Sequence, residues 1–126
     1  MNKQIIKTDK APSPIGPYNQ AISANGLLFI SGQVALIPGS NEMRMDNITT
    51  ETEQVMDNLK SILTEAGLTF ENVVKTTIFL KDMSFFSEVN ASYGSHFTDK
   101  FPARETIAVK GLPKDVNVEI SMIACY

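Results

Sequence analysis

Apolar residues recur at helical spacing along one long segment of the chain and predict an amphipathic helix there. The Thr50-x-x-Glu53 pattern is typical of a capping box and is expected to open this helix, and Gly67 is expected to end it. The apolar positions within it are Val55, Met56, Leu59, Ile62, Leu63 and Ala66. Because only one face is apolar, the helix is expected to lie on a sheet.

A second helix is predicted from about Phe85 to Phe97, with Ser84 as its N-cap. Its apolar stripe consists of Phe86, Val89, Tyr93 and Phe97, which we interpret as core packing.

Short apolar runs before these helices predict strands. The segments 20–24 and 27–32 flank Asn25-Gly26, the strongest short hairpin signal, because both turn residues need a positive φ. Apolar side chains on both sides of 27–32 predict a strand that is buried on both faces. Ile5-Ile6 predicts a further short strand, and the proline-rich stretch 11–18 predicts an extended loop.

Three strands are predicted later in the chain, at 73–81, 105–109 and 116–124, with a turn at 112–115. The last strand has an apolar side and a side that is half polar. The half-polar side comprises Asn117, Glu119, Ser121, Ile123 and Cys125. Such a face, if no helix covers it, could be solvated or could form a subunit interface that contains a wet cleft.

The order of strands, helix, strand, helix and strands predicts an α+β fold, with a mixed sheet and both helices on one face. The 126 residues, of which 43% are hydrophobic, are expected to form a single domain at 1–126. A lone cysteine excludes an internal disulfide, and no apolar stretch suggests a membrane span or a signal peptide, so a cytoplasmic protein is expected. The net charge of −3 and the scattered lysines argue against binding of nucleic acid.

Two charged residues suggest chemistry. Arg104 follows a rigid Pro-Ala step, and Glu119 lies in the middle of the last strand. A guanidinium can bind a carboxylate through two parallel hydrogen bonds, and a glutamate can handle a proton of water. Together they would suit hydrolysis of a small substrate that bears a carboxylate. The simpler interpretation of these two segments alone is a pair of surface charges on a sheet.

Other candidate residues also have structural interpretations. Ser31-Gly32 could meet a ligand or form a strand-end turn, and Tyr18 could cover a ligand or pin its loop to the core. Asn90 is expected to be solvated or bonded to a neighbouring strand. His96, the only histidine, is interpreted as a helix-end or surface residue rather than a metal ligand or a general base. The sequence contains no Gly-rich phosphate loop and no Gly-x-Ser-x-Gly elbow.

These residues, in this order, resemble the YjgF/RidA family of reactive intermediate deaminases over essentially the whole chain. The most specific segments are 15–18 (IGPY), 30–33 (ISGQ), 66–68 (AGL), 74–79 (VKTTIF), 89–93 (VNASY), 101–104 (FPAR) and 112–120 (LPKDVNVEI). The resemblance implies a chorismate-mutase-like α+β fold, assembled as a homotrimer with sites between subunits.

The resemblance also implies a reaction, the hydrolysis of 2-iminobutanoate or 2-iminopropanoate to a 2-oxo acid and ammonia without metal or organic cofactor. It implies that Arg104 clamps the substrate carboxylate and that Glu119 positions the attacking water. The site-lining positions that it implies are Tyr18, Ser31, Gly32 and Asn90, together with the backbone N–H of Thr106. A non-catalytic regulator that binds 2-oxo acids and an endoribonuclease or translation inhibitor are the alternatives.

The chain departs from the family pattern beside the arginine. Thr106 stands where many members have cysteine, which is expected to alter the pocket shape. Glu105 would compete for the clamp if it paired with Arg104. The segment 93–101 is slightly shorter than in typical members, which could alter the rim of the cleft.

Overall fold

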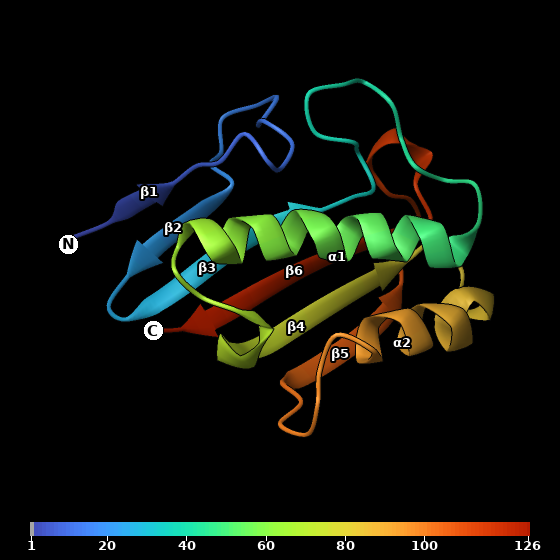
Figure 1. Cartoon of the computed structure of the whole chain (residues 1–126). Helices are drawn as coiled ribbons and strands as arrows, with labels where there is room; N and C mark the ends of the chain where they lie inside the picture. Colours follow the sequence, from blue (N-terminus) through green and yellow to red (C-terminus); the bar gives the residue numbers. More distant parts are fainter. Residues whose placement is uncertain (1) are drawn as a thin grey trace.

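The computed structural model describes residues 2–126 as a six-stranded mixed sheet with two α-helices on one of its faces (Figure 1). The elements are β1 Gln4–Ile6, β2 Ala21–Ala24, β3 Leu27–Gln33, α1 Ile48–Glu65, β4 Val73–Leu80, α2 Phe86–Gly94, β5 Ala103–Ala108 and β6 Val118–Cys125, with single 3₁₀ turns at η1 Phe70–Asn72, η2 Met83–Phe85 and η3 Pro113–Asp115. The predicted α+β class is confirmed.

The strands lie in the order β1-β2-β3-β6-β4-β5, and every neighbouring pair is antiparallel except β4 and β5. Parallel neighbours need a crossover connection, and α2 lies within this one. The last strand in the sequence, β6, lies in the interior of the sheet between β3 and β4. Strand β5 forms one edge of the sheet, beside α2 (Figure 1).

The predicted hairpin of β2 and β3 is confirmed, with Asn25 and Gly26 at φ values of 52° and 78°. The prediction that β3 is buried on both faces is wrong. Leu28 and Ile30 lie in the core, but Phe29 on the other face is 42% exposed, because no helix covers that face in one chain.

Helix α1 begins two residues before the predicted capping box. Asn47 is the N-cap, and its side chain accepts a hydrogen bond from the backbone N–H of Thr50. The carboxylate of Glu53 therefore does not cap the helix and instead contacts residues in and beyond α2. Gly67, with φ of 78°, follows the end of the helix as predicted.

The start of the second helix was also predicted wrongly. Asp82, not Ser84, supplies the capping oxygen, which accepts a hydrogen bond from the backbone N–H of Ser84 and starts η2. Helix α2 ends at Gly94 rather than Phe97, and β5 begins at Ala103, so Arg104 lies within the strand. Among residues 2–126, neither helix has the combination of length and apolar character needed to cross a membrane.

The two faces of the sheet differ as the alternation in the last strand predicted. Val118, Ile120, Met122 and Ala124 of β6 are buried on the face that α1 covers. Glu119, Ser121 and Ile123 alternate with them and therefore lie on the helix-free face. The sheet thus separates an apolar core from a face of mixed polarity.

Candidate functional site

Arg104 is held by α2. Its Nη1 atom donates a hydrogen bond of 2.7 Å to Oδ1 of Asn90. The guanidinium carbon lies 5.3 Å from the ring centroid of Tyr93 and 5.8 Å from that of Phe86. Both distances fall in the range of cation–π attraction, so the position of the guanidinium is set by one hydrogen bond and two aromatic rings.

The three residues that hold Arg104 come from one face of α2. Phe86, Asn90 and Tyr93 are spaced by four and three residues, which places them on adjacent turns of one helix face. The apolar stripe predicted only core packing for Phe86 and Tyr93, and their contact with the arginine was not predicted. This spacing, with an asparagine between two aromatics, is the signal that could have found it.

The position of Tyr93 is fixed by burial and by a hydrogen bond to the sheet. It is buried, and its hydroxyl donates a hydrogen bond of 3.0 Å to Oγ1 of Thr76 on β4. Burial raises the pKa of the Tyr93 hydroxyl, and the Thr76 bond and the charge of Arg104 oppose this effect. The ring under the guanidinium is therefore an uncharged phenol at neutral pH.

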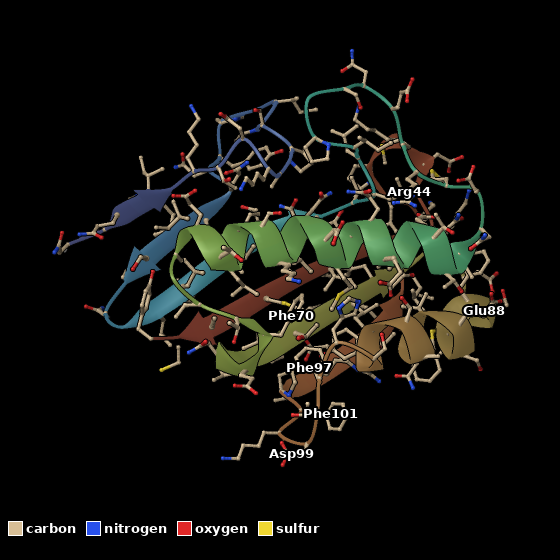
Figure 2. All side chains as sticks on the ribbon, viewed as in Figure 1. Arg44, Phe70, Glu88, Phe97, Asp99 and Phe101 are labelled. Atoms are coloured by element: carbon tan, nitrogen blue, oxygen red, sulfur yellow. The ribbon has the colours of Figure 1, made fainter. Side chains whose placement is uncertain are left out.

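A cavity of about 490 Å³ adjoins the guanidinium. Its walls are formed by Asn90, Tyr93, Gly94, Phe101, Pro102 and Arg104. Figure 2 shows Phe101 in the loop between α2 and β5, where its side chain is 59% exposed. The guanidinium has five N–H groups, so donors remain for an anionic ligand in this cavity after one is given to Asn90.

Glu119 lies in a second cavity, on β6. Its strand neighbours are Phe79 of β4 and, on the other side, the backbone of Gly32. A Cβ atom on Gly32 would lie 2.2 Å from Oε2 of Glu119, so only glycine leaves room for the carboxylate there. The side chain is half-buried, and this burial raises the pKa of the Glu119 carboxyl above its ordinary value of 4.5.

The cavity around Glu119 measures about 120 Å³ and is also lined by Tyr18, Gly32 and Lys114. Tyr18 is 50% exposed, so the interpretation that it pins its loop to the core is not supported. Of the sequence-predicted site residues, the structure thus brings Tyr18, Gly32 and Glu119 together.

Ser31 lies beside this cavity rather than in it. Its hydroxyl donates a hydrogen bond of 2.6 Å to the carbonyl of Asn19. The residue lines an open groove, together with Tyr18 and Ser121, on the helix-free face. Ser31 therefore fixes the loop that carries Tyr18 at the rim of the Glu119 cavity.

The two departures beside Arg104 have different surroundings. Glu105 points to the helix-free face, where it accepts a hydrogen bond from Thr77 and lies 3.1 Å from Nζ of Lys75. The hydrogen bonds from Thr77 and Lys75 lower the pKa of Glu105, which does not compete with Asn90 for Arg104. Thr106 faces the helices, and its buried Oγ1 has no hydrogen-bond partner among residues 2–126.

One chain does not bring Arg104 and Glu119 together. Arg104 is the register partner of Thr76 in β4, whereas Glu119 is the partner of Phe79. Positions 76 and 79 face opposite sides of the strand, so the two candidate catalytic groups project from opposite faces of the sheet. The cavity at Arg104 therefore offers a guanidinium that can bind an anion, and the cavity at Glu119 offers a carboxyl that can take up a proton.

No cluster of three or more histidine, cysteine, aspartate or glutamate side chains within residues 2–126 has a geometry that could hold a metal ion. The single cysteine of the chain, Cys125, is exposed and forms no disulfide within the described residues.

Comparison with known proteins gives consistent matches. The family model described as endoribonuclease L-PSP matches residues 8–126. A RutC family protein from Synechocystis sp. is 52% identical over 126 residues, which cover 98% of this chain and 97% of the relative. The putative regulator AldR from Lactococcus lactis is 50% identical over 121 residues, 96% of each chain.

The reactive intermediate deaminase A of Arabidopsis thaliana chloroplasts is 42% identical over 124 residues, covering 98% of this chain and 66% of that protein. Among solved structures, the Rid family protein YyfA from Yersinia pestis superimposes with a TM-score of 0.96 at 43% identity, covering 99% and 100% of the two chains. TdcF from E. coli with bound serine gives a TM-score of 0.92 at 33% identity, covering 98% of each chain.

Proposed function

This chain belongs to the YjgF/RidA family, and on that premise we propose that it hydrolyses small 2-imino acids to 2-oxo acids and ammonia. The substrates proposed are 2-iminobutanoate and 2-iminopropanoate. The name of the Arabidopsis relative, a reactive intermediate deaminase, supports this class of reaction.

The observation that carries the proposal is the preset guanidinium of Arg104. Asn90 and two aromatic rings orient it beside a cavity of about 490 Å³, which is large enough for a small 2-imino acid. A planar guanidinium binds a carboxylate through two parallel hydrogen bonds, which fixes the imine carbon of a 2-imino acid relative to the site.

Glu119 supplies the proton handling in this proposal. Its carboxylate takes a proton from a water molecule whose oxygen bonds to the imine carbon, and the C=N π electrons move to nitrogen. When the imine is protonated, this addition gives a carbinolamine with a neutral amino group. Glu119 then passes its proton to that nitrogen and takes up the hydroxyl proton as the C=O bond forms and the C–N bond breaks, which releases ammonia and a 2-oxo acid. The released ammonia carries the proton away from Glu119 as ammonium. Because burial raises the pKa of Glu119, its carboxyl is a better proton carrier near neutral pH than an exposed glutamate.

We propose further that each site forms between two protomers of a homotrimer. Arg104 and Glu119 project from opposite faces of one sheet, so a complete site needs Arg104 of one chain beside Glu119 of another. The helix-free face carries Phe29 and Ile107, both more than 40% exposed, which an assembly would cover. Tyr18, Ser31 and Thr106 are then expected to line the substrate.

A coupled assay tests the reaction. A threonine dehydratase would generate 2-iminobutanoate, and its loss would be followed against a trapping amine. We expect the protein to accelerate the loss, and Arg104→Ala to reduce kcat/KM by about a hundredfold or more, because the charged, two-pronged contact to the substrate carboxylate is removed. Arg104→Lys should also be weak, since an ammonium lacks the two-pronged geometry.

The matched control is Arg44→Ala, which removes the chain's other arginine from an exposed loop. It should keep wild-type activity. The proposal fails if wild-type protein does not speed loss of the imine, or if Arg104→Ala remains fully active.

A regulatory role without turnover is the second candidate, and the observation that favours it is the name of the Lactococcus relative, a putative regulator. It predicts saturable binding of 2-oxobutanoate by calorimetry with no acceleration in the imine assay. An endoribonuclease role follows only from the description of the matching family, and the net charge of −3 opposes it. RNA cleavage that disappears in Arg104→Ala would support that role.

A further inference from the structure

We propose that Glu53 of α1 is a positioning residue for the Arg104 clamp, acting through α2 and Asn90. This inference rests on the proposed function, because it assigns a role in carboxylate binding to a residue outside both cavities. Among residues 2–126, Glu53 makes no hydrogen bond to Arg104 and does not line the cavity at Arg104 or the cavity at Glu119.

Glu53 links α1 to α2 and to His96, which lies two residues beyond the end of α2. One carboxylate oxygen accepts a hydrogen bond from the hydroxyl of Ser92, a residue that is 7% exposed. Nε2 of His96 lies 3.1 Å from each of the two carboxylate oxygens. Within residues 2–126, these are the polar side-chain links that the structure shows between α1 and the α2 segment.

Helix α2 depends on such an anchor. It has nine residues, a length at which an isolated helix is marginal in water. Its N-cap residue, Phe85, makes no side-chain capping bond, and its last turn contains no basic residue. The orientation of α2 is therefore set by its contacts with the rest of the chain. Glu53 contacts Ser92, two residues after Asn90, and His96, six residues after it.

The anchor continues toward the Arg104 cavity through aromatic contacts. The ring of His96 lies 5.4 Å from that of Phe70, which lies 5.6 Å from Phe97. Phe97 in turn contacts Tyr93 at 4.9 Å and Phe101 at 6.0 Å, measured between ring centroids. Figure 2 shows Phe70, Phe97 and Phe101 in succession between α1 and the loop that precedes β5.

Asn90 and Tyr93, which hold the guanidinium, thus sit on a short helix whose polar attachment to α1 is Glu53. Without that attachment, α2 keeps its Tyr93–Thr76 hydrogen bond to β4 but can tilt about it, while the β5 backbone stays paired with β4. Because the bond from Arg104 to Asn90 joins these two elements, a small shift of α2 changes the direction of the guanidinium fork. The consequence is weaker carboxylate binding rather than slower proton transfer at Glu119.

Calorimetry with 2-oxobutanoate, the proposed product, measures the clamp directly. Glu53→Ala should raise Kd, and raise KM in the imine assay, by about tenfold with kcat changed less than about twofold. Glu53→Gln keeps an oxygen for Ser92 and should recover most of the affinity. Asp57→Ala, which removes an exposed carboxylate one turn further along α1, is the matched control and should leave Kd unchanged.

A double-mutant cycle separates positioning from general destabilisation. If Glu53 acts through Asn90, then Glu53→Ala should have little effect on Kd once Asn90→Ala is present. An equal effect in both backgrounds, or wild-type affinity in Glu53→Ala, would overturn the inference. Thermal unfolding of each variant shows whether the compared proteins are folded at the assay temperature.

A third measurement does not depend on the reaction. The ¹⁵N–¹H signal of Arg104 Nε reports the environment of the guanidinium in ligand-free protein. It should shift or broaden in Glu53→Ala and stay in place in Asp57→Ala. A wild-type protein that neither binds nor hydrolyses refutes the proposed function, whereas an unchanged Nε signal in Glu53→Ala refutes the positioning role itself.

Discussion

The carboxylate of Glu119 lies close against the backbone of Gly32 at the candidate site. The glycine φ is not in the left-handed region, so the backbone itself would accept a side chain. What excludes one is the carboxylate, because an added Cβ would lie 2.2 Å from Oε2 and 2.9 Å from Cδ of Glu119. The glycine therefore serves the position of the carboxyl rather than a turn.

Gly32→Ala tests that role. Because the clashing atoms are the end of a flexible side chain, we expect Glu119 to swing away, with kcat/KM lowered about tenfold or more and the melting temperature little changed. Gly111→Ala is the control, since a Cβ there meets nothing within 4 Å and its φ is not positive. Wild-type kcat/KM in Gly32→Ala would contradict the assigned position.

The raised pKa of Glu119 has opposite consequences for stability and for activity. Its folded pKa lies above its unfolded value, so the stability it contributes is complete below the unfolded pKa and is lost as pH rises through the folded pKa. Glu119→Gln cannot ionise, and we expect it to gain stability relative to wild type as pH rises from the ordinary glutamate pKa through the raised pKa of Glu119. Denaturant unfolding across that range measures the difference.

The same variant should lose most of its imine hydrolase activity. In wild type, kcat/KM should rise with pH through an apparent pKa above 4.5, as Glu119 ionises and becomes able to accept a proton from water. Glu42→Gln, in an exposed loop, should alter neither profile. An acidic limb that persists unchanged in Glu119→Gln would show that another group sets it.

At the scale of elements, side chains of α1 bond to α2, which holds Arg104, and to the segment that precedes Glu119. Its first turn carries Glu51, which is fully buried. The Glu51 carboxylate accepts hydrogen bonds of 2.8 Å from the backbone and side-chain nitrogens of Asn117, and one of 3.3 Å from the backbone of Val118. These bonds fix the chain immediately before Glu119.

Glu51→Ala should lower the free energy of unfolding by about 3 kcal/mol, because it leaves buried N–H groups without an acceptor. Urea denaturation at pH 7 measures this loss. Glu65→Ala, at the exposed end of the same helix, should change the free energy by no more than about 0.5 kcal/mol. Similar values for the two variants would mean that the Glu51 bonds contribute little net stability.

At the scale of the whole molecule, the sheet itself divides the chemistry. Arg104 opens toward the helix side at the β5 edge, and Glu119 opens toward the helix-free face of β6. No local rearrangement of side chains brings them together across a sheet. This division is the reason to expect that the working unit contains more than one chain.

A mixing experiment tests the shared site. Arg104→Ala and Glu119→Ala should each be inactive alone, but random assembly of both in trimers should restore about a quarter of wild-type activity, since a site needs one intact residue from each neighbour. The control is Arg104→Ala protein taken alone through the same mixing procedure, which should remain inactive. Absence of recovery in mixed trimers of verified mass would place both residues in one chain.

Much of the fold follows from local patterns in the sequence. The alternation in β6, the Asn25-Gly26 turn and the spacing of apolar residues in α1 predicted elements that the structure confirms. Helix starts were predicted less well, because several polar residues near each start can accept the same backbone N–H. Asn47 and Asp82 fill that role instead of Thr50 and Ser84.

The sequence by itself determined the element types, the half-polar side of β6 and the candidate residues Arg104 and Glu119, because periodicity and residue chemistry are local properties. Only the tertiary structure decided that Phe86, Asn90 and Tyr93 surround the arginine, and that the two candidate groups face opposite sides of the sheet. Those facts depend on strand order and register, which join residues far apart in the chain and leave no local signature.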